Sequence, residues 1–387
     1  MILFDDQYRD SLLPFTFTRP SAHIRCGILT MAEKWEMVME ATATYATQTY
    51  LQARYGAFGV GEQLWINGRV FPTEEVVKKV KALTSGEALI IDDILIAAKT
   101  TYTNVEFIKE RSKLITCDVA VVQIKHSWDI FQLNDKAIAL DWKLLALKPT
   151  SKAFEQNNTL IGSDIYIHPS AKVQGSFLNA STGPIYIGEG TEVMEGTLIR
   201  GPFALCSGAT VKMGAKIYGA TTIGPHCKVG GEISNSVLFA YSNKGHDGFL
   251  GNSVLGEWCN LGADTNTSNL KNNYGPVRAW NYVTESMENT ALQFCGLMMG
   301  DHSKSSINTM FNTGTVVGVA ANVFGGGFPP KFIPSFSWGG AHGFETFNID
   351  KAYEVAQRMM ERRNIMFDKI DQGIFSHIFS ETKKYRK

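Results

Sequence analysis

The sequence predicts an α/β domain, followed by a parallel β-helix of hexapeptide repeats and a closing helix. Strand-like and helix-like segments alternate over residues 1–150, which is typical of layered α/β folds. From Ile187 to Val229 an aliphatic residue recurs at every sixth position without a miss, and such a period indicates a β-helix. Apolar residues at helical spacing within 346–363 predict the closing helix.

Length and composition agree with a globular protein of several domains. The chain has 387 residues, of which 44% are hydrophobic, so it can bury a large core. We expect three parts, at residues 1–150, 159–330 and 331–387. The 37 Lys and Arg residues balance 37 Asp and Glu residues, which gives a formal net charge of zero. This balance argues against a nucleic-acid-binding face and against attraction to an anionic membrane surface.

The N-terminal residues and the cysteines favour a cytoplasmic protein. Asp5 and Asp6 stand where a signal peptide would have a cationic start and an apolar run. No stretch reaches 18 apolar residues, so no membrane span is expected. Six cysteines are scattered along the chain without a Cys-x-x-Cys pair, which predicts reduced, mostly buried thiols.

Capping patterns and periodicity predict the elements of the N-terminal part. A helix is expected over residues 32–50, because Thr30 can cap it and Glu33 completes a capping box. Thr73 is the expected cap of a second helix over 74–83, which carries one apolar face. We expect strands at residues 63–66, 88–91 and 119–124.

The six-residue period extends on both sides of its regular run. Each hexapeptide supplies one short strand and one turn, and three of them make a triangular coil with the aliphatic side chains inside. A single coil cannot bury these side chains, so stacked coils supply the core. Three interruptions, at residues 178–184, 235–248 and 267–296, are expected to leave the prism as loops. The aliphatic positions are Ile161, Ile167, Val173, Ile187, Val193, Ile199, Leu205, Val211, Ile217, Ile223, Val229, Leu255, Leu261, Phe311, Val317 and Val323.

One segment of the β-helix resembles a known family. Residues 235–269 read NSVLFAYSNKGHDGFLGNSVLGEWCNLGADTNTSN, and the runs GDH at 300–302 and INT at 307–309 follow. They resemble the acetyltransferase half of the bifunctional sugar-1-phosphate nucleotidylyltransferase/amino-sugar acetyltransferases that make UDP-N-acetylglucosamine, and most of all their archaeal relatives. The resemblance implies a left-handed β-helix, acetyl-CoA as the acyl donor, and a sugar phosphate or nucleotide sugar as partner. It also implies a homotrimer with active sites between subunits.

His246 is the residue that this segment favours as catalytic. Transfer of an acetyl group to an amine needs the amine neutral, and a histidine with an ordinary pKa of about 6.5 can take its proton at cellular pH. The resemblance implies this general-base role, and it implies that Asn269 lies near the sugar and the thioester. The alternatives are a loop histidine hydrogen-bonded for shape and an asparagine that only forms a turn. Candidate phosphate contacts, which could equally be solvated charges, are Lys244, Lys271 and Arg278.

The N-terminal part resembles a divergent sugar nucleotidyltransferase branch that is fused to such β-helices. The resemblance rests on the run FTRPSAHIRCGILT at 17–30, and the glycine-rich nucleotide loop of the family is missing. Arg19 and Arg25 could bind phosphates in place of that loop, or they could form structural salt bridges.

The metal site of that family is altered in this sequence. The run LWINGRVFP at 64–72 carries Arg69 where the family has an Asp ligand of Mg²⁺, which removes a hard oxygen ligand. The run WDIFQLN at 128–134 resembles a segment whose Asn helps to hold the metal, so Asn134 is the candidate ligand if Mg²⁺ is used.

Three functions follow from these patterns. The first is a transferase of nucleotide-sugar metabolism, whose β-helix moves an acetyl or other acyl group from acyl-CoA to an amino sugar phosphate or nucleotide sugar. The second is a sugar-1-phosphate nucleotidylyltransferase that uses the β-helix as a trimerisation scaffold. The third is a nucleotide-sugar sensor without turnover.

Overall fold

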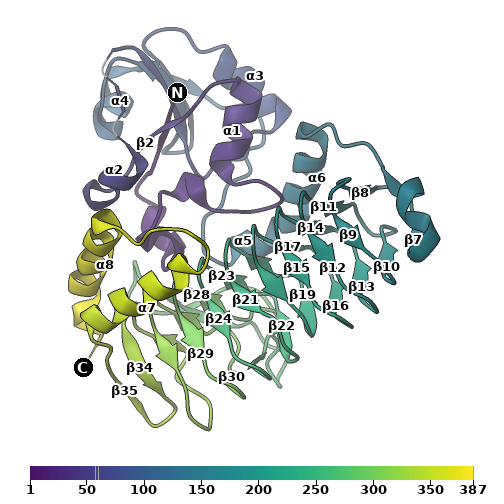
Figure 1. Ribbon diagram of the computed structural model, residues 1–387. Helices are drawn as coiled ribbons and strands as arrows, with labels where there is room; N and C mark the ends of the chain where they lie inside the picture. Colours follow the sequence, from purple (N-terminus) through teal and green to yellow (C-terminus); the bar gives the residue numbers. More distant parts are fainter. Residues whose placement is uncertain (57, 60, 387) are drawn as a thin grey trace.

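A computed structural model describes residues 1–56, 58–59 and 61–386. Figure 1 shows an N-terminal α/β part lying along one side of a long prism of short strands, with the C-terminal helices packed beside it. The predicted fold class is therefore confirmed. No helix within the described ranges is long and apolar enough to cross a membrane.

A six-stranded sheet forms the centre of the N-terminal part, in the order β2-β1-β3-β5-β4-β6. Strand β1 is parallel to both of its neighbours, whereas β5 is antiparallel to β3 and β4. The strands are β1 (Ile2–Phe4), β2 (Thr44–Ala46), β3 (Gln63–Asn67), β4 (Glu87–Ile91), β5 (Ile94–Thr100) and β6 (Lys113–Thr116). The helices are α1 (Met31–Met39), α2 (Thr49–Tyr55), α3 (Glu74–Lys81), α4 (Val105–Arg111), α5 (Asp129–Gln132) and α6 (Asn134–Leu144).

The two predicted helix starts and the predicted strands at 63–66 and 88–91 are confirmed, whereas two other predictions are wrong. The capping box of Thr30 begins α1, and the Thr73 side chain accepts a hydrogen bond from the Val76 amide at the start of α3. The first helix ends at Met39 rather than at residue 50, because the chain turns at Glu40 (φ 52°) and then adds β2 to the sheet edge. Residues 119–124 form no strand, and only an isolated bridge joins Gln123 to the loop after β3.

Three sheets form the faces of the prism, and their strands are parallel except for the last strand of the third sheet. The first face contains β7 (Thr159–Ile161), β10 (Phe177–Asn179), β13 (Leu198–Arg200), β16 (Lys216–Tyr218), β19 (Glu232–Ser234) and β22 (Phe249–Gly251), and the pair β25 (Asn266–Thr267) and β30 (Met310–Phe311) follows. The second contains β8 (Ile165–Ile167), β11 (Ile185–Ile187), β14 (Phe203–Leu205), β17 (Thr221–Ile223), β20 (Val237–Leu238), β23 (Val254–Leu255), β28 (Met298–Met299), β31 (Val316–Val317) and β33 (Phe332–Ile333). The third contains β9 (Lys172–Val173), β12 (Glu192–Val193), β15 (Thr210–Val211), β18 (Lys228–Val229), β21 (Asn243–Lys244), β24 (Asn260–Leu261), β29 (Lys304–Ser305), β32 (Asn322–Val323), β34 (Ser337–Gly340) and β35 (Gly343–Thr346).

The six-residue period predicts the interior of this prism. Ile187 is in register with Ile167 and Leu205 of the neighbouring coils, and all three are fully buried. Such stacked aliphatic side chains are the main source of stability in a solenoid.

The three predicted interruptions have different outcomes. Leu178 belongs to β10 and is buried in the core, so the first excursion begins only after that strand. The segment 235–248 stays within the coil, since it contains β20 and β21. The segment 267–296 does leave the prism, and it carries the hairpin of β26 (Arg278–Asn281) and β27 (Ser286–Asn289).

Two helices close the chain, where only one was predicted. Helix α7 (Ile349–Glu361) buries Ala352, Ala356 and Met360, and α8 (Lys369–Glu381) lies beside α2. Arg54 of α2 forms an ion pair with Asp371 of α8 at 2.6 Å, which joins the N-terminal part to the C-terminal helices. One hydrophobic cluster includes residues of the N-terminal part, the β-helix and both C-terminal helices.

Candidate functional site: a cationic groove at His246

A groove of about 540 Å³ runs between the third face of the prism and the end of α7. His246 lies on its wall and its side chain is exposed. The groove is lined by Lys212, Lys228, Tyr241, Asn243, Gly245, His246, Trp258, Asn260, Leu261, Gly262, Ala263, Ile307, Met359, Arg362 and Arg363.

The position of His246 is fixed through its backbone. The residue follows β21 in a turn, and the Lys244 ammonium donates a hydrogen bond to the His246 carbonyl at 2.5 Å. On the next residue, the Asp247 carbonyl accepts from the Asp264 amide at 3.1 Å. The imidazole therefore projects from an anchored turn into the groove, as a general base requires.

Lys244 itself lies inside the prism, and its side chain is not on the surface. It is in register with Val229, at a position that other coils fill with an aliphatic residue, and it is only 2% exposed. Burial lowers the pKa of Lys244 to about 8, although Asp247 and Asp264 oppose this effect. Its ammonium thus supports the His246 turn, and it is not placed to contact a phosphate in the groove.

Four cations line the groove. Lys212 and Lys228 come from neighbouring coils, and Arg362 and Arg363 follow the last turn of α7. The Arg363 guanidinium also donates to the His226 carbonyl at 3.4 Å, which ties the end of α7 to the prism. A concave surface with several cations attracts an anionic ligand, and arginine in particular suits phosphate groups.

An aromatic column forms one side of the groove. The rings of His226, Tyr241, Trp258 and His302 come from a corner of the prism in four coils, and each residue has a φ near +60°. Tyr241 and Trp258 are almost parallel, with ring centroids 4.2 Å apart and an interplanar angle of 3°. These two rings form a rigid apolar wall within a cationic groove.

Two amide side chains face the same groove. Asn243 and Asn260 are register partners on β21 and β24. The Asn243 Oδ1 atom is buried and has no hydrogen-bond partner among the described residues, so it is available to a donor on a ligand.

Asn269 does not lie with His246. Its side chain donates to the Asn252 Oδ1 atom at 2.8 Å, beyond the C-terminal end of β22, whereas His246 precedes that strand. The two residues occupy different corners of the same prism. Their joint role at one site therefore remains a prediction that needs a second subunit.

Lys271 and Arg278 lie on the excursion 267–296 and do not line the groove. Arg278 donates to the Met287 carbonyl across its hairpin, and Lys271 donates to the Pro276 carbonyl at 3.3 Å. Both charges lie near Lys331, since they help burial to lower the pKa of that residue.

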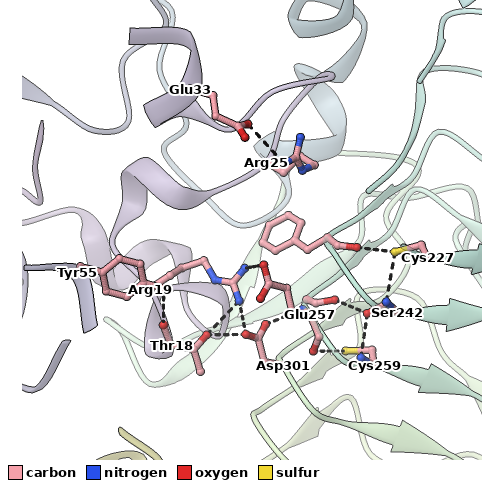
Figure 2. Close-up of polar contacts among 12 residues, drawn as sticks. Thr18, Arg19, Arg25, Glu33, Tyr55, Cys227, Ser242, Glu257, Cys259 and Asp301 are labelled. Atoms are coloured by element: carbon pink, nitrogen blue, oxygen red, sulfur yellow. Dashed lines mark hydrogen bonds and ion pairs between the residues drawn. The ribbon is translucent and has the colours of Figure 1, made fainter. Parts of the chain in front are cut away.

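Arg19 and Arg25 lie between the N-terminal part and the β-helix (Figure 2). Arg19 is 3% exposed and forms ion pairs with Asp301 and, at 3.2 Å, with Glu257. Arg25 donates to the Ile28 carbonyl and approaches Glu33 at 3.5 Å. The salt-bridge alternative for these two residues thus fits their positions better than phosphate binding.

Asn134 is held between the same two parts and does not fit a metal-binding role. Its Oδ1 atom accepts from the Gly27 amide at 2.7 Å and from the Thr222 hydroxyl at 3.0 Å, and its Nδ2 atom donates to the Ala220 carbonyl at 2.9 Å. All of its polar atoms are used within the protein, so none is left for Mg²⁺.

Arg69 fills the place where the family would have its Asp ligand. Its guanidinium donates to both carboxylate oxygens of Asp6, and the NH1 atom donates to the Ile124 carbonyl at 2.7 Å. Within the described ranges no group of three or more His, Cys, Asp or Glu residues is placed to hold a metal ion. These residues do not fit Mg²⁺, because a buried cation already pairs with the nearest carboxylate.

Comparisons with known proteins agree with this architecture. Residues 1–150 match the family model described as sugar nucleotidyl transferase. Bifunctional protein GlmU of Synechococcus elongatus is 24% identical over 242 residues, which cover 56% of this chain and 49% of that protein. GlmU of Methanocaldococcus jannaschii is 32% identical over 87 residues, or 22% of this chain and 21% of that protein. The chain is similar to these GlmU proteins over part of its length.

This result confirms the resemblance inferred from the motifs, but the match covers only part of each chain. The chain spans about half or less of the length of these GlmU relatives. A crystal structure of the polySia-specific acetyltransferase NeuO is 12% identical, covers 53% of this chain and 94% of its own, and has a TM-score of 0.29.

Most of the groove around His246 was not predictable from the sequence. Lys212 and Lys228 could have been recognised, since each stands next to an inward-facing aliphatic residue of the period, Val211 or Val229. Their own side chains must therefore face outward. The pair Arg362-Arg363 at the end of the predicted helix was also visible. Nothing in the repeat indicated that this helix returns to the same face of the prism.

Proposed function

We propose that the β-helix transfers an acetyl or another acyl group from acyl-CoA to the amine of an amino sugar phosphate or a nucleotide sugar. The observation that carries this proposal is the location of His246 in a groove with four cations. Acyl-CoA and the phosphorylated acceptor are both anionic, so the charges of Lys212, Lys228, Arg362 and Arg363 suit them.

His246 acts as the general base of this reaction. It takes a proton from the acceptor nitrogen while that nitrogen forms a bond to the thioester carbon. The carbon–sulfur bond then breaks, and the sulfur leaves as the thiol of CoA after it gains a proton. The Asn243 Oδ1 atom and the exposed backbone groups of the coils are the polar groups that can orient the donor.

The decisive experiment measures thiol release from acetyl-CoA with a panel of amino sugar 1-phosphates and nucleotide-linked amino sugars. His246→Ala should lower the rate by about 10²–10⁴-fold, the usual contribution of a general base. His342→Ala is the matched control, because His342 is exposed and lies outside the groove. Absence of thiol release with every acceptor would contradict the proposal.

A second candidate is nucleotidylyl transfer by the N-terminal part, which the family match over residues 1–150 favours. Pyrophosphate release from a nucleoside triphosphate and a sugar 1-phosphate, unchanged in His246→Ala, would support it. The places of Arg69 and Asn134 in the structure mean that we derive no metal-dependent step for this part. Binding of a nucleotide sugar without turnover at either site would instead favour a sensor.

We also propose that the chain works as a cytoplasmic homotrimer. The first face of the prism exposes Ile161, Phe177, Leu198 and Tyr218, with 41–49% of each residue accessible, and such a patch suits a subunit interface. All six cysteines are free and buried, as expected in a reducing compartment. Light scattering of the purified chain tests the trimer, and Leu198→Glu should convert it to a monomer.

A further inference from the structure

A second cavity lies where the three parts of the chain meet. This junction pocket has a volume of about 230 Å³ and is lined by the loop at Arg19 and helix α2, by the coils at Glu257 and His302, and by Met360 of α7, Phe367 of the following loop and Phe375 of α8. It shares the Tyr241 and Trp258 side chains with the His246 groove. The two sites thus lie on either side of one aromatic pair.

An unpaired imidazole lines this pocket. His302 is 8% exposed, and its buried Nδ1 atom has no hydrogen-bond partner among the described residues. Burial lowers the pKa of His302 well below its ordinary value, and the charges of Lys304 and Arg19 add to this effect. The ring is therefore neutral and has one nitrogen that can accept a hydrogen bond. A donor on a ligand would supply the hydrogen bond that this buried nitrogen lacks.

The charges of the junction pocket differ from those of the groove. Three carboxylates line it, from Glu257, Asp301 and Asp371, against the two guanidiniums of Arg19 and Arg54. Arg19 and Asp301 pair closely, as Figure 2 shows, while the Glu257 side chain is 35% exposed and is the carboxylate most open to a ligand. This balance disfavours phosphate and favours a cation.

Aromatic rings complete the cavity. Trp258, Phe367 and Phe375 are nearly buried, and His302 lies among them with its ring centroid 5.1 Å from that of Phe375 and 6.1 Å from that of Trp258. The faces of aromatic rings attract ammonium groups. The volume is below the ~300–1,000 Å³ of sites for drug-sized ligands, so the ligand is a single ring or a short chain.

We propose that the junction pocket is a binding site for a small organic ammonium ion. The ammonium group donates hydrogen bonds to Glu257 and to the unpaired His302 nitrogen. Aromatic rings surround it, from Trp258, Phe367 and Phe375. This site is separate from the His246 groove and does not depend on acyl transfer. Its location makes the ligand a link between the N-terminal part, the β-helix and the C-terminal helices.

Calorimetric titration of the full chain with glucosamine tests this proposal, with glucose as the control of the same size that lacks the ammonium group. Glucosamine should bind at least about tenfold more tightly than glucose, since loss of one charged hydrogen bond costs about 1.5–3 kcal/mol. Glu257→Gln, which can still accept from Arg19, should weaken glucosamine binding by about tenfold or more. His302→Phe should weaken it as well while keeping the aromatic packing.

Two control variants separate this site from the groove. Lys228→Ala and His246→Ala should bind glucosamine as the unaltered protein does, even if neither transfers an acyl group. Equal binding of glucose and glucosamine, no binding of either, or affinity unchanged in both Glu257→Gln and His302→Phe would overturn the proposal. Loss of binding in Lys228→Ala would also overturn it, because it would place glucosamine in the groove. Thermal melting of each variant confirms that it is folded.

Discussion

The Arg19 guanidinium forms a buried ion pair with the Asp301 carboxylate, which lies 282 residues later in the sequence. The pair joins the loop that precedes α1 to the β-helix, and both side chains are 4% exposed. The same carboxylate accepts from the Thr18 hydroxyl at 2.7 Å and from the Glu257 amide at 2.9 Å (Figure 2). Asp301 therefore fixes the N-terminal part against the prism.

Breaking this pair should loosen the whole molecule. Because removal of one partner leaves a buried charge without compensation, we expect Arg19→Ala or Asp301→Ala to lower the free energy of unfolding by about 3–5 kcal/mol. A double-mutant cycle followed by denaturant unfolding should give a smaller loss for the double variant than the sum of the single losses. Lys113→Ala, which removes an exposed ion pair with Glu87, is the control and should cost at most about 1 kcal/mol. Additive losses at Arg19 and Asp301 would contradict the assignment.

The groove cations should act on donor binding rather than on chemistry. We expect Lys212→Ala and Lys228→Ala each to raise the KM for acetyl-CoA by about 2–10-fold with little change in kcat, since each removes one partly solvated charge contact. Raising the salt concentration should reduce the difference in KM between each variant and the unaltered enzyme, because salt screens such contacts. Lys78→Ala on α3, where Lys78 forms an exposed ion pair with Glu74, is the control. A fall in kcat at constant KM would show that these lysines have another role.

The repeat period predicted the interior of the prism because each coil repeats the same constraint. Ile187 and Val193 had to stack on their equivalents wherever the neighbouring coils lay. The positions of Arg19 and Asn134 were not predictable in this way, because their partners are Asp301 and Thr222, far away in the sequence. A local pattern cannot distinguish a cation that binds phosphate from one that pairs with a distant carboxylate.

The candidate site was predictable only in part for the same reason. His246 was identified because its neighbours carry a motif, whereas the cations around it come from two coils and from the end of α7. The spacing from Ile223 to Leu238 is shorter than the regular coil length, which obscured the fact that Lys244 occupies an aliphatic position. The aromatic column was not recognised because its members stand at corners that the period does not describe.

Asn134 should contribute to stability and not to metal binding. Asn134→Leu removes three buried hydrogen bonds and leaves the Gly27 amide and the Ala220 carbonyl unpaired, so we expect a loss of about 2–4 kcal/mol in the free energy of unfolding. Isothermal titration with Mn²⁺ should give the same result for the variant and for the unaltered protein. Asp135→Ala, at the exposed neighbouring position, should change neither property. A Mn²⁺ site that disappears in Asn134→Leu would restore the metal-binding hypothesis.

Lys244 should lower the free energy of unfolding, although its ammonium holds the His246 turn in place. Its pKa of about 8 in the folded protein is below the ordinary 10.5, so the unfolded chain holds the proton more strongly. Below pH 8 Lys244 is protonated in both the folded and the unfolded chain. Burial of its charge then lowers the free energy of unfolding by the full amount, up to about 3 kcal/mol. As pH rises from 8 to 10.5, only the unfolded chain keeps the proton, and this loss in the free energy of unfolding disappears. Lys244→Met should therefore be more stable than the unaltered protein at pH 7, and this advantage should shrink across that interval.

Unfolding measured at pH 7 and at pH 10 for both proteins tests this directly. Lys304 also has a pKa lowered to about 8 by burial and keeps its own pH dependence, so only the difference between the two proteins isolates Lys244. Because the variant loses the hydrogen bond to the His246 carbonyl, we expect acyl transfer to fall by roughly tenfold while stability rises, as small displacements of a catalytic group can have such effects. If Lys244→Met is less stable at pH 7, contacts within the prism must offset the burial of the Lys244 charge, which would contradict the prediction. If turnover is unchanged, the other contacts of the turn must be enough to hold His246 in place.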